Sequence, residues 1–330
     1  MTSSGRLMAI PCLNEAAHLP QLIASLIQDA LPSDLIVIVD GGSTDGSREI
    51  VLDWAARDAR VVLLSNPARI QSAGLNLAVE RYGADRQFLI RIDAHAAYPR
   101  HFADVLTSTA TRTRADSVVV PMRTVGRDCF QIAAATAQNS KIGAGGSAHR
   151  IGGRSGWIDH GHHALMRLEA FKRIGGYDPT FTHNEDAEYD RRLTEAGGRI
   201  WFQSDLAIDY YPRRSPAALF RQYVNHGRGR ARTALKHHMA LKPRQLAPAL
   251  VGPAVGVGGA ALLAAVFFNP LAIVAALPAL LWVLVCLGGG VQAAHSAKSP
   301  ACGYLAGVTA MVMHLGWSLG FLQGRFLLNR

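Results

Sequence analysis

The C-terminal quarter of this 330-residue chain has no acidic side chains. From Pro248 to Arg330 there is no Asp or Glu, and the only basic residues are Lys298, Arg325 and Arg330. All 24 acidic residues and 34 − 3 = 31 lysines and arginines lie in residues 1–247, which therefore carry 31 − 24 = +7. A basic front part followed by an apolar tail indicates a cytosolic domain held at an anionic membrane.

Cysteine is also scarce, and its spacing excludes familiar cysteine sites. The four cysteines are Cys12, Cys129, Cys286 and Cys302, and none of them forms a C-x-x-C pair. This spacing gives no sign of a zinc knuckle or a disulfide framework, so we expect a reducing compartment. The apolar patch near the N-terminus is too short for the core of a signal peptide, so we expect residues 1–247 to remain in the cytoplasm.

Two glycine motifs that bind nucleotides are missing. Neither G-x-G-x-x-G nor G-x-x-x-x-G-K-[ST] occurs in the chain. The best sequence evidence for a Rossmann dehydrogenase or a P-loop NTPase is therefore missing. The positive front part carries no nucleic-acid motif, and we expect no nucleic-acid partner.

The first hundred residues alternate between strand and helix patterns. Apolar strand runs end at Cys12, Asp40, Asn66 and Asp93, and amphipathic helix patterns separate them. Such repeats predict an α/β sheet that is largely parallel, with ligands at the carboxyl ends of the strands. Polar residues follow every one of these ends.

Three apolar stretches in the tail have the length of membrane spans. They cover about 248–268, 271–291 and 303–323. Each can cross roughly 30 Å of hydrocarbon, although a buried helical hairpin remains the alternative. We therefore predict a domain at 1–247 and a membrane region at 248–330.

The basic segment 213–244 precedes the first predicted span, so we expect that end of the span to lie on the cytoplasmic side. Three spans would then place the C-terminus, with Arg325 and Arg330, on the outer side. That orientation conflicts mildly with the excess of basic residues expected on the cytoplasmic side.

Several short motifs carry candidate chemistry. Asp93 and His95 follow a strand at i, i+2 and suit one divalent cation, with the imidazole favouring Mn²⁺ over Mg²⁺; a solvated strand end is the alternative. "HNEDAEYDRRL" supplies either a general base or a charged helix face. "DHGHHA" matches no zinc signature. "NHGRGRART" suits phosphate binding or anionic lipid headgroups.

Taken in order, these motifs resemble the family-2 glycosyltransferases of the GT-A fold. The resemblance begins at "IPCLNE" and continues through "VDGGSTDGS", "NPARIQSAGLN", "RIDAH" (a variant D-x-D) and "HNEDAEYDRRL". Within the family, "GGSAHR", "DHGHHA" and "GRGRART" are similar to the membrane-anchored exopolysaccharide glucosyltransferases of the succinoglycan type. The resemblance covers roughly residues 6–240, and it implies a Rossmann-like mixed sheet followed by transmembrane helices.

The resemblance also implies roles for individual residues. Asp186 would be the catalytic base, Asp93 and His95 would hold Mn²⁺ or Mg²⁺, and Glu185, His160 and His162 would lie on the acceptor side. The residues expected to bind the nucleotide sugar are Pro11, Asn14, Glu15, Asp40, Asn76, Asp93, Arg228 and Arg230. Three departures stand out: Cys12–Leu13 replaces the usual x-Tyr, Gly41 replaces a second Asp, and the Q-x-x-R-W motif is absent.

The implied activity is inverting transfer of one sugar, with glucose expected, from a UDP-sugar to a saccharide linked to polyprenyl diphosphate. The enzyme would act in exopolysaccharide or cell-surface glycan synthesis at the cytoplasmic face of the inner membrane. Three alternatives remain open: another nucleotide sugar, a simple lipid acceptor, or a membrane scaffold without catalysis.

Overall fold

The computed structural model describes residues 5–145, 153–240, 243–297 and 299–326. The chain divides into two compact units: residues 1–122 with 152–210, and residues 123–151 with 211–330. We call these the catalytic unit and the C-terminal unit and describe each by itself. The loop motif "GGSAHR" lies outside the described residues, apart from Gly145.

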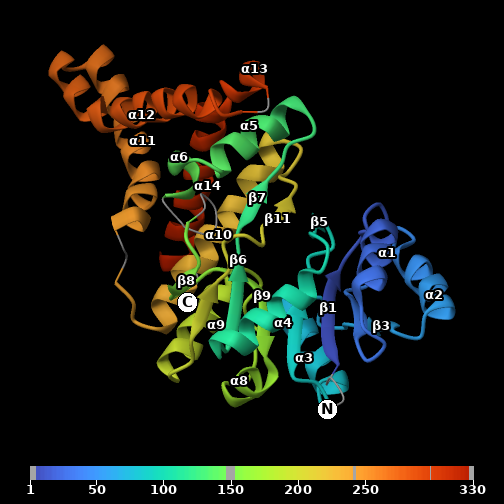
Figure 1. Ribbon diagram of the computed structural model, residues 1–330. Helices are drawn as coiled ribbons and strands as arrows, with labels where there is room; N and C mark the ends of the chain where they lie inside the picture. Colours follow the sequence, from blue (N-terminus) through green and yellow to red (C-terminus); the bar gives the residue numbers. More distant parts are fainter. Residues whose placement is uncertain (1–4, 146–152, 241–242, 298, 327–330) are drawn as a thin grey trace. The chain divides into compact units, whose positions relative to one another are not determined.

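The catalytic unit alternates strands and helices along the chain (Figure 1). The predicted strand and helix segments of the first hundred residues are confirmed. The strands are β1 (Arg6–Cys12), β2 (Leu35–Asp40), β3 (Val61–Ser65), β4 (Phe88–Arg91), β5 (Ala96–Ala97), β6 (Ser117–Val120), β8 (Gly156–Ile158), β9 (His162–Arg167), β10 (Ile200–Phe202) and β11 (Ile208–Tyr210), with β7 (Met122–Thr124) at the boundary between the units. The helices are α1 (Leu19–Asp29), α2 (Ser47–Arg57), α3 (Gln71–Tyr82), α4 (Phe102–Thr113), α8 (Leu168–Arg173) and α9 (Glu185–Glu195).

The main sheet of the catalytic unit is mixed. Among the described residues its strand order is β3-β2-β1-β4-β9-β6-β10-β8. The first four strands are parallel to one another, as the β-α repeats predict. Strand β9 then runs antiparallel to both β4 and β6. This reversal decides which segments meet at the candidate site.

Helices cover both faces of the sheet. Alternate residues of β1 face opposite sides, with Met8 and Ile10 in one apolar cluster and Leu7 and Ala9 in the other. Helices α1, α2 and α4 contribute to the first cluster, and α3, α8 and α9 contribute to the second. The central strands are buried on both sides, which explains their continuous apolar runs.

The C-terminal unit is built from helices. They are α5 (Cys129–Gln138), α6 (Lys141–Ala144), α10 (Pro216–Lys236), α11 (Pro243–Phe267), the 3₁₀ helix η1 (Pro270–Ala276), α12 (Leu277–Ala294), α13 (Pro300–Gly303) and α14 (Ala306–Phe326). Three segments among the described residues are long and apolar enough to cross a membrane, namely 245–267, 270–294 and 300–326. They coincide with the three predicted stretches.

The expectation of no disulfide is wrong. Cys129 at the start of α5 is bonded to Cys302 in α13, with 5.1 Å between their Cα atoms. The two cysteines are 173 residues apart, so local spacing carries no signal of the pair. Cys12 and Cys286 are free thiols.

Candidate active site

The loops after β1 and β2 are bonded to each other. The Asn14 Oδ1 accepts from the Thr44 backbone N–H at 2.8 Å, and the Asn14 N–H donates to the Ser43 hydroxyl at 2.9 Å. The backbone N–H of Glu15 donates to the Ser47 hydroxyl at 2.9 Å. Asn14 adopts a left-handed φ of 59°, which asparagine tolerates better than most residues. These bonds fix Asn14 and Glu15 beside the β2–α2 turn, and the pairing of β1 with β2 places Pro11 opposite Val39.

Asp40 organises that turn from within. Its carboxylate accepts from the backbone N–H groups of Gly42 (3.2 Å) and Ser43 (3.0 Å) and from Arg48 Nη1 (2.6 Å). Burial opposes ionisation, but these donors lower the pKa of Asp40. The side chain is almost fully buried. Asp40 therefore shapes the loop from within, and its predicted contact with the nucleotide stays a prediction.

Strand pairing brings "RIDAH" and "DHGHHA" together. In the antiparallel β4–β9 pair, Ile90 lies opposite Leu165, so the end of β4 meets the beginning of β9. As a result, His162 Nε2 lies 3.5 Å from Asp93 Oδ2. His95 is near the same carboxylate and also contacts Glu15, with 3.0 Å between His95 Nδ1 and Glu15 Oε1. The structure therefore places His162 beside the candidate metal residues.

The donors around Asp93 fit a divalent cation that is shared with a substrate. No group of three His, Cys, Asp or Glu side chains converges as a metal centre among the described residues. Asp93 and His162 nevertheless bring an oxygen and an imidazole nitrogen together, and His95 is close by. Mg²⁺ and related cations commonly take one or two protein ligands and complete their shell with phosphate oxygens and water. An imidazole donor suits Mn²⁺.

Arg91 links the metal residues to the acidic helix, and sequence reasoning missed it. Its Nη1 donates to Glu185 Oε1 at 3.1 Å, and its Nε lies 3.5 Å from Asp93 Oδ1. Burial opposes ionisation of Asp93, but the charges of Arg91, His162 and His95 lower its pKa. A charged residue within the apolar run "FLIRID" was the available signal, because a buried arginine needs acidic partners.

Glu185 and Asp186 begin α9 and differ in their ionisation. Burial, together with the charge of Asp186, raises the pKa of Glu185, although Arg91 opposes the shift. Burial also opposes ionisation of Asp186, but His160, His163 and Arg91 lower its pKa below the ordinary range. The N-terminus of a helix favours an anion as well. The pKa values of these two neighbouring carboxyl groups are therefore driven apart, and Asp186 is the one that stays ionised.

Asp190 holds two histidines in place. It lies one helical turn after Asp186, and its oxygens are 2.7 Å from His160 Nδ1 and 2.7 Å from His163 Nε2. His163 Nδ1 is in turn 2.6 Å from the Tyr177 hydroxyl. Asp190 and His163 are buried, whereas the His160 side chain is 34% exposed. Sequence reasoning named His160 but missed Asp190, although an i, i+4 spacing from Asp186 could have indicated it.

Two predicted nucleotide contacts, Asn76 and Arg228, have other partners in the structure. The side-chain amide of Asn76 donates to the Tyr177 carbonyl at 2.7 Å and accepts from the Tyr177 N–H at 2.9 Å, so its position gives no support to a nucleotide contact. Arg228 and Arg230 belong to α10 of the C-terminal unit. Arg228 donates to Gln323 Oε1 from Nε at 2.9 Å and from Nη2 at 2.6 Å.

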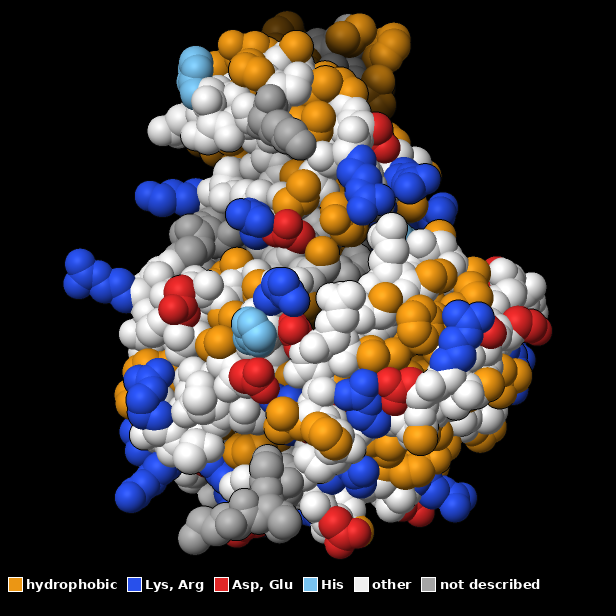
Figure 2. Space-filling model, turned by 45° about the vertical axis from the view of Figure 1, so that its right-hand side comes forward, with side chains coloured by type: hydrophobic (Ala, Val, Ile, Leu, Met, Phe, Trp, Pro, Cys, Tyr) orange, Lys and Arg blue, Asp and Glu red, His pale blue; other side chains and the backbone are white. Residues whose placement is uncertain are grey.

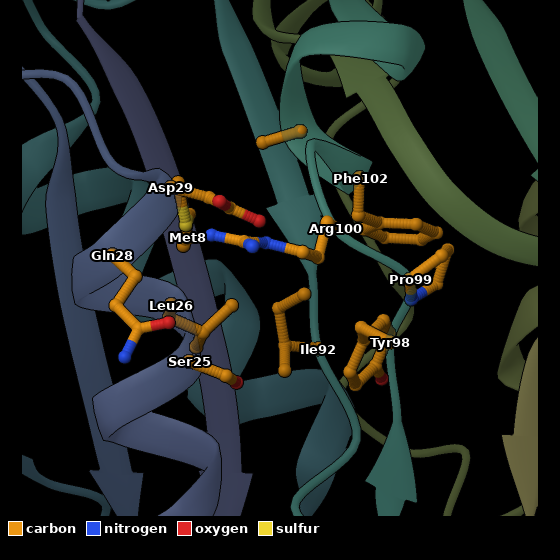
Figure 3. Close-up of a pocket in the computed structure, with 11 residues that line it drawn as sticks. Met8, Ser25, Leu26, Gln28, Asp29, Ile92, Tyr98, Pro99, Arg100 and Phe102 are labelled. Carbon is orange, nitrogen blue, oxygen red and sulfur yellow. The ribbon is translucent and has the colours of Figure 1, made fainter.

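A separate cavity of about 210 Å³ lies on the α1 side of the sheet (Figure 3). Ser25, Leu26 and Gln28 face it from α1, and Tyr98 and Phe102 face it from the opposite wall. None of its lining residues is a predicted site residue. Tyr98 connects it indirectly to the site, because its hydroxyl accepts from the Asp93 N–H at 2.6 Å.

The mixed sheet and the polar loops at the carboxyl ends of its strands define a GT-A-like glycosyltransferase. The model of the family "Glycosyl transferase family 2" matches residues 8–175. The chain belongs to this family and is a glycosyltransferase, as its motifs predict. It is 52% identical over 322 residues to the succinoglycan biosynthesis protein ExoA of Rhizobium meliloti (strain 1021), covering 97% of this chain and 95% of that protein.

Solved structures show the same fold at low sequence identity. The mannosyltransferase PcManGT of Pyrobaculum calidifontis, in complex with GDP-Man and Mn²⁺, matches with a TM-score of 0.58 and 18% identity, over 97% of this chain and 87% of that chain. GalNAc-T7 with UDP, GalNAc and Mn²⁺ matches with a TM-score of 0.51 and 15% identity, over 69% of this chain and 48% of that chain. The predicted GT-A fold is therefore confirmed.

Proposed function

We propose that the protein transfers one sugar, with inversion, from a UDP-sugar to a lipid-linked saccharide during exopolysaccharide synthesis, with glucose as the expected sugar. The observation that carries the proposal is Asp186, a partly buried carboxylate held ionised beside His160 and the Arg91–Asp93 pair. The similarity to a succinoglycan biosynthesis protein over nearly the whole chain supports the pathway class.

Asp186 is suited to act as the general base. It takes the proton of the acceptor hydroxyl while that oxygen forms a bond to the anomeric carbon of the sugar. The bond from this carbon to the diphosphate oxygen breaks, and UDP leaves with the electron pair. Attack from the face opposite the leaving group inverts the anomeric configuration. Glu185 and His160 line the acceptor side of this base.

Asp93 and His95 would hold the Mn²⁺ or Mg²⁺, and the position of His162 3.5 Å from Asp93 makes it a further candidate ligand. When bound, the cation supplies positive charge to the departing diphosphate. Arg91 keeps Asp93 ionised and ready for this role. Pro11, Asn14 and Glu15 would contact the nucleoside from the loop that Asp40 supports.

The C-terminal helices would hold the enzyme at the inner membrane, with the catalytic unit in the cytoplasm. Membrane lipids would then surround the apolar helices, and an acceptor on polyprenyl diphosphate would reach the site from the bilayer. This placement explains why a transferase carries an uncharged tail after a basic segment. An enzyme that transferred equally well to free, water-soluble sugars without lipid would contradict this acceptor.

A donor screen tests the proposed function. Membranes containing the full chain are incubated with lipid extract, Mn²⁺ and radiolabelled UDP-glucose, UDP-galactose, UDP-GlcNAc, UDP-glucuronate or GDP-mannose. We expect label from UDP-glucose in the organic phase and its loss on chelation of the metal. Label from a different donor alone would overturn the choice of glucose.

The matched variants are Asp186→Asn and Asp85→Asn. Asp85 is an exposed residue in a turn, so its substitution should leave transfer unchanged. Loss of the general base should lower transfer about 10²- to 10⁴-fold while donor binding persists. Undiminished transfer by Asp186→Asn would contradict the assignment of the base.

A further inference from the structure

We propose that α14 does not cross the membrane but lies at its cytoplasmic surface as a pair with α10. Helices α11 and α12 then form a single membrane hairpin, and the chain ends on the side where it begins. The inference rests on the proposed membrane attachment and refines it, because composition alone counts α14 as a third span.

The three apolar helices differ in how much of their surface the protein covers. The apolar window is 17% buried in 245–267 and 11% buried in 270–294, but 50% buried in 300–326. Large side chains of the first two segments point outward, including Phe267 (70% exposed), Leu271 (76%) and Leu284 (66%). Hydrophobic side chains gather over the C-terminal helices in Figure 2. Among the described helices, α11 and α12 therefore present broader apolar surfaces than α14 does.

Glycines of α14 bring its backbone against that of α10. A Cβ atom would lie 2.7 Å from the Phe220 carbonyl oxygen at Gly316 and 1.9 Å from the Val224 carbonyl oxygen at Gly320. At Gly324 it would lie 3.0 Å from the Arg228 carbonyl oxygen. The contacts advance by four residues on both helices, so the helices run parallel, side by side (Figure 1).

Because α10 is paired with α14, a membrane-spanning α14 would bring the charged side chains of α10 into the bilayer. Contacts to α14 run from Leu219 to Ala231 of α10, about 18 Å of helix at 1.5 Å per residue. Arg221, Arg228 and Arg232 are exposed on α10 along or next to this length. They recur at steps of seven and four residues, which places them on one face of the helix. Arginines are costly in the middle of a hydrocarbon layer but favourable beside anionic headgroups.

The remaining neighbours of α14 are also protein segments and not lipid. Ala306, Ala310 and Met313 pack against Ala134 and Ala137 of α5. His314 Nε2 is 2.8 Å from the carbonyl oxygen of Ile142 in α6. Helix α5 begins after the charged residues Arg127 and Asp128, so a membrane-spanning α14 would draw this segment into the bilayer too.

The two-span arrangement removes the charge conflict of the three-span prediction. With an even number of crossings, Arg325 and Arg330 lie on the cytoplasmic side, as the excess of basic residues on that side requires. The surface of the α10–α14 pair then faces anionic headgroups through Arg221, Arg228 and Arg232.

Reporter fusions to the full chain test the position of the C-terminus. Green fluorescent protein and alkaline phosphatase are each fused after Arg330 and produced in Escherichia coli; the first fluoresces only inside, and the second is active only outside. We expect fluorescence and no phosphatase activity. Phosphatase activity without fluorescence would overturn the proposal.

Single-cysteine labelling with a membrane-impermeant maleimide tests the hairpin. Asn269→Cys, between α11 and η1, should react in intact spheroplasts, and the matched Asp85→Cys in the catalytic unit should react only after lysis. The unsubstituted chain, with buried Cys12 and Cys286, gives the background. Protection of Asn269→Cys in spheroplasts would overturn the crossing. Transfer measured in the same membranes shows separately whether the proposed catalytic function holds.

Discussion

Asp186 is ionised because its neighbours outweigh its burial. His160, His163 and Arg91 hold its pKa below the ordinary aspartate value of about 3.9. As the proposed base, Asp186 should therefore remain ionised above pH 5, and its protonation should not limit transfer there. A decline in the transfer rate between pH 7 and 5 would have to come from the titration of other groups.

His160→Asn should move the acid limit of transfer to higher pH. The substitution removes a side chain that carries positive charge in acid, and the pKa of Asp186 then rises toward its usual range. Initial rates at saturating donor between pH 3 and 6, the range in which an ordinary aspartate titrates, measure the shift in both enzymes. Identical acid limbs would show that His160 does not act on Asp186.

Asp190→Asn should weaken both folding and transfer. The neutral amide loses two charge-assisted contacts, to His160 and His163, and we expect a loss of about 1–3 kcal/mol in the free energy of unfolding. Transfer should fall through kcat more than through the KM for the donor, because Asp190 positions other groups. Urea unfolding and steady-state kinetics of the solubilised enzyme measure the two effects.

The control for Asp190→Asn is Glu195→Gln on the same helix. Glu195 forms an exposed i, i+4 pair with Arg191, which is worth at most about 0.5 kcal/mol. The folded-state pKa of Asp190 is lowered, so the stability that it contributes is fully present above its unfolded pKa of about 4 and is lost as pH falls below that value through the lower folded-state pKa. Equal losses in the two variants would contradict the role given to Asp190.

At the scale of elements, the α10–α14 pair depends on glycine. A methyl group at Gly320 would lie 1.9 Å from the Val224 carbonyl oxygen, whereas one at Gly259 of α11 meets no atom within 4 Å. Gly320→Ala should destabilise the protein by about 1–3 kcal/mol through overpacking. Gly259→Ala should be neutral or stabilising by up to about 1 kcal/mol, because alanine favours helix.

Thermal unfolding of the two glycine variants in one detergent measures this difference. A lower midpoint for Gly320→Ala alone is expected. Equal midpoints would mean that the two helices do not touch along this stretch, and the argument for a paired α14 would lose its main support.

At the scale of the whole molecule, the disulfide connects segments that are distant in sequence. Denatured protein, purified without reductant, should show two reactive thiols, Cys12 and Cys286, and four after reduction. Cys302→Ser should leave Cys129 as an additional reactive thiol without reductant. Thiol titration with peptide mapping distinguishes these states, and four thiols before reduction would contradict the pairing.

The sequence by itself determined the β-α alternation, the residues at the strand ends and the three apolar tail segments. Each of these depends on local pattern: apolar periodicity, the residue that ends a run, and the length of a segment without charge. Asp93, His95 and Asp186 could be named for that reason, and the family motifs added their expected roles.

Only the tertiary structure decided which of these residues meet. The reversed direction of β9 places His162 beside Asp93, and the turn spacing of α9 brings Asp190 to His160 and His163. The tertiary structure also bonds the side chain of Asn76 to the backbone of Tyr177 and joins Cys129 to Cys302 in a disulfide. Long-range pairing of this kind leaves no periodic trace in the chain, because it depends on strand direction and helix packing between segments that are far apart in sequence.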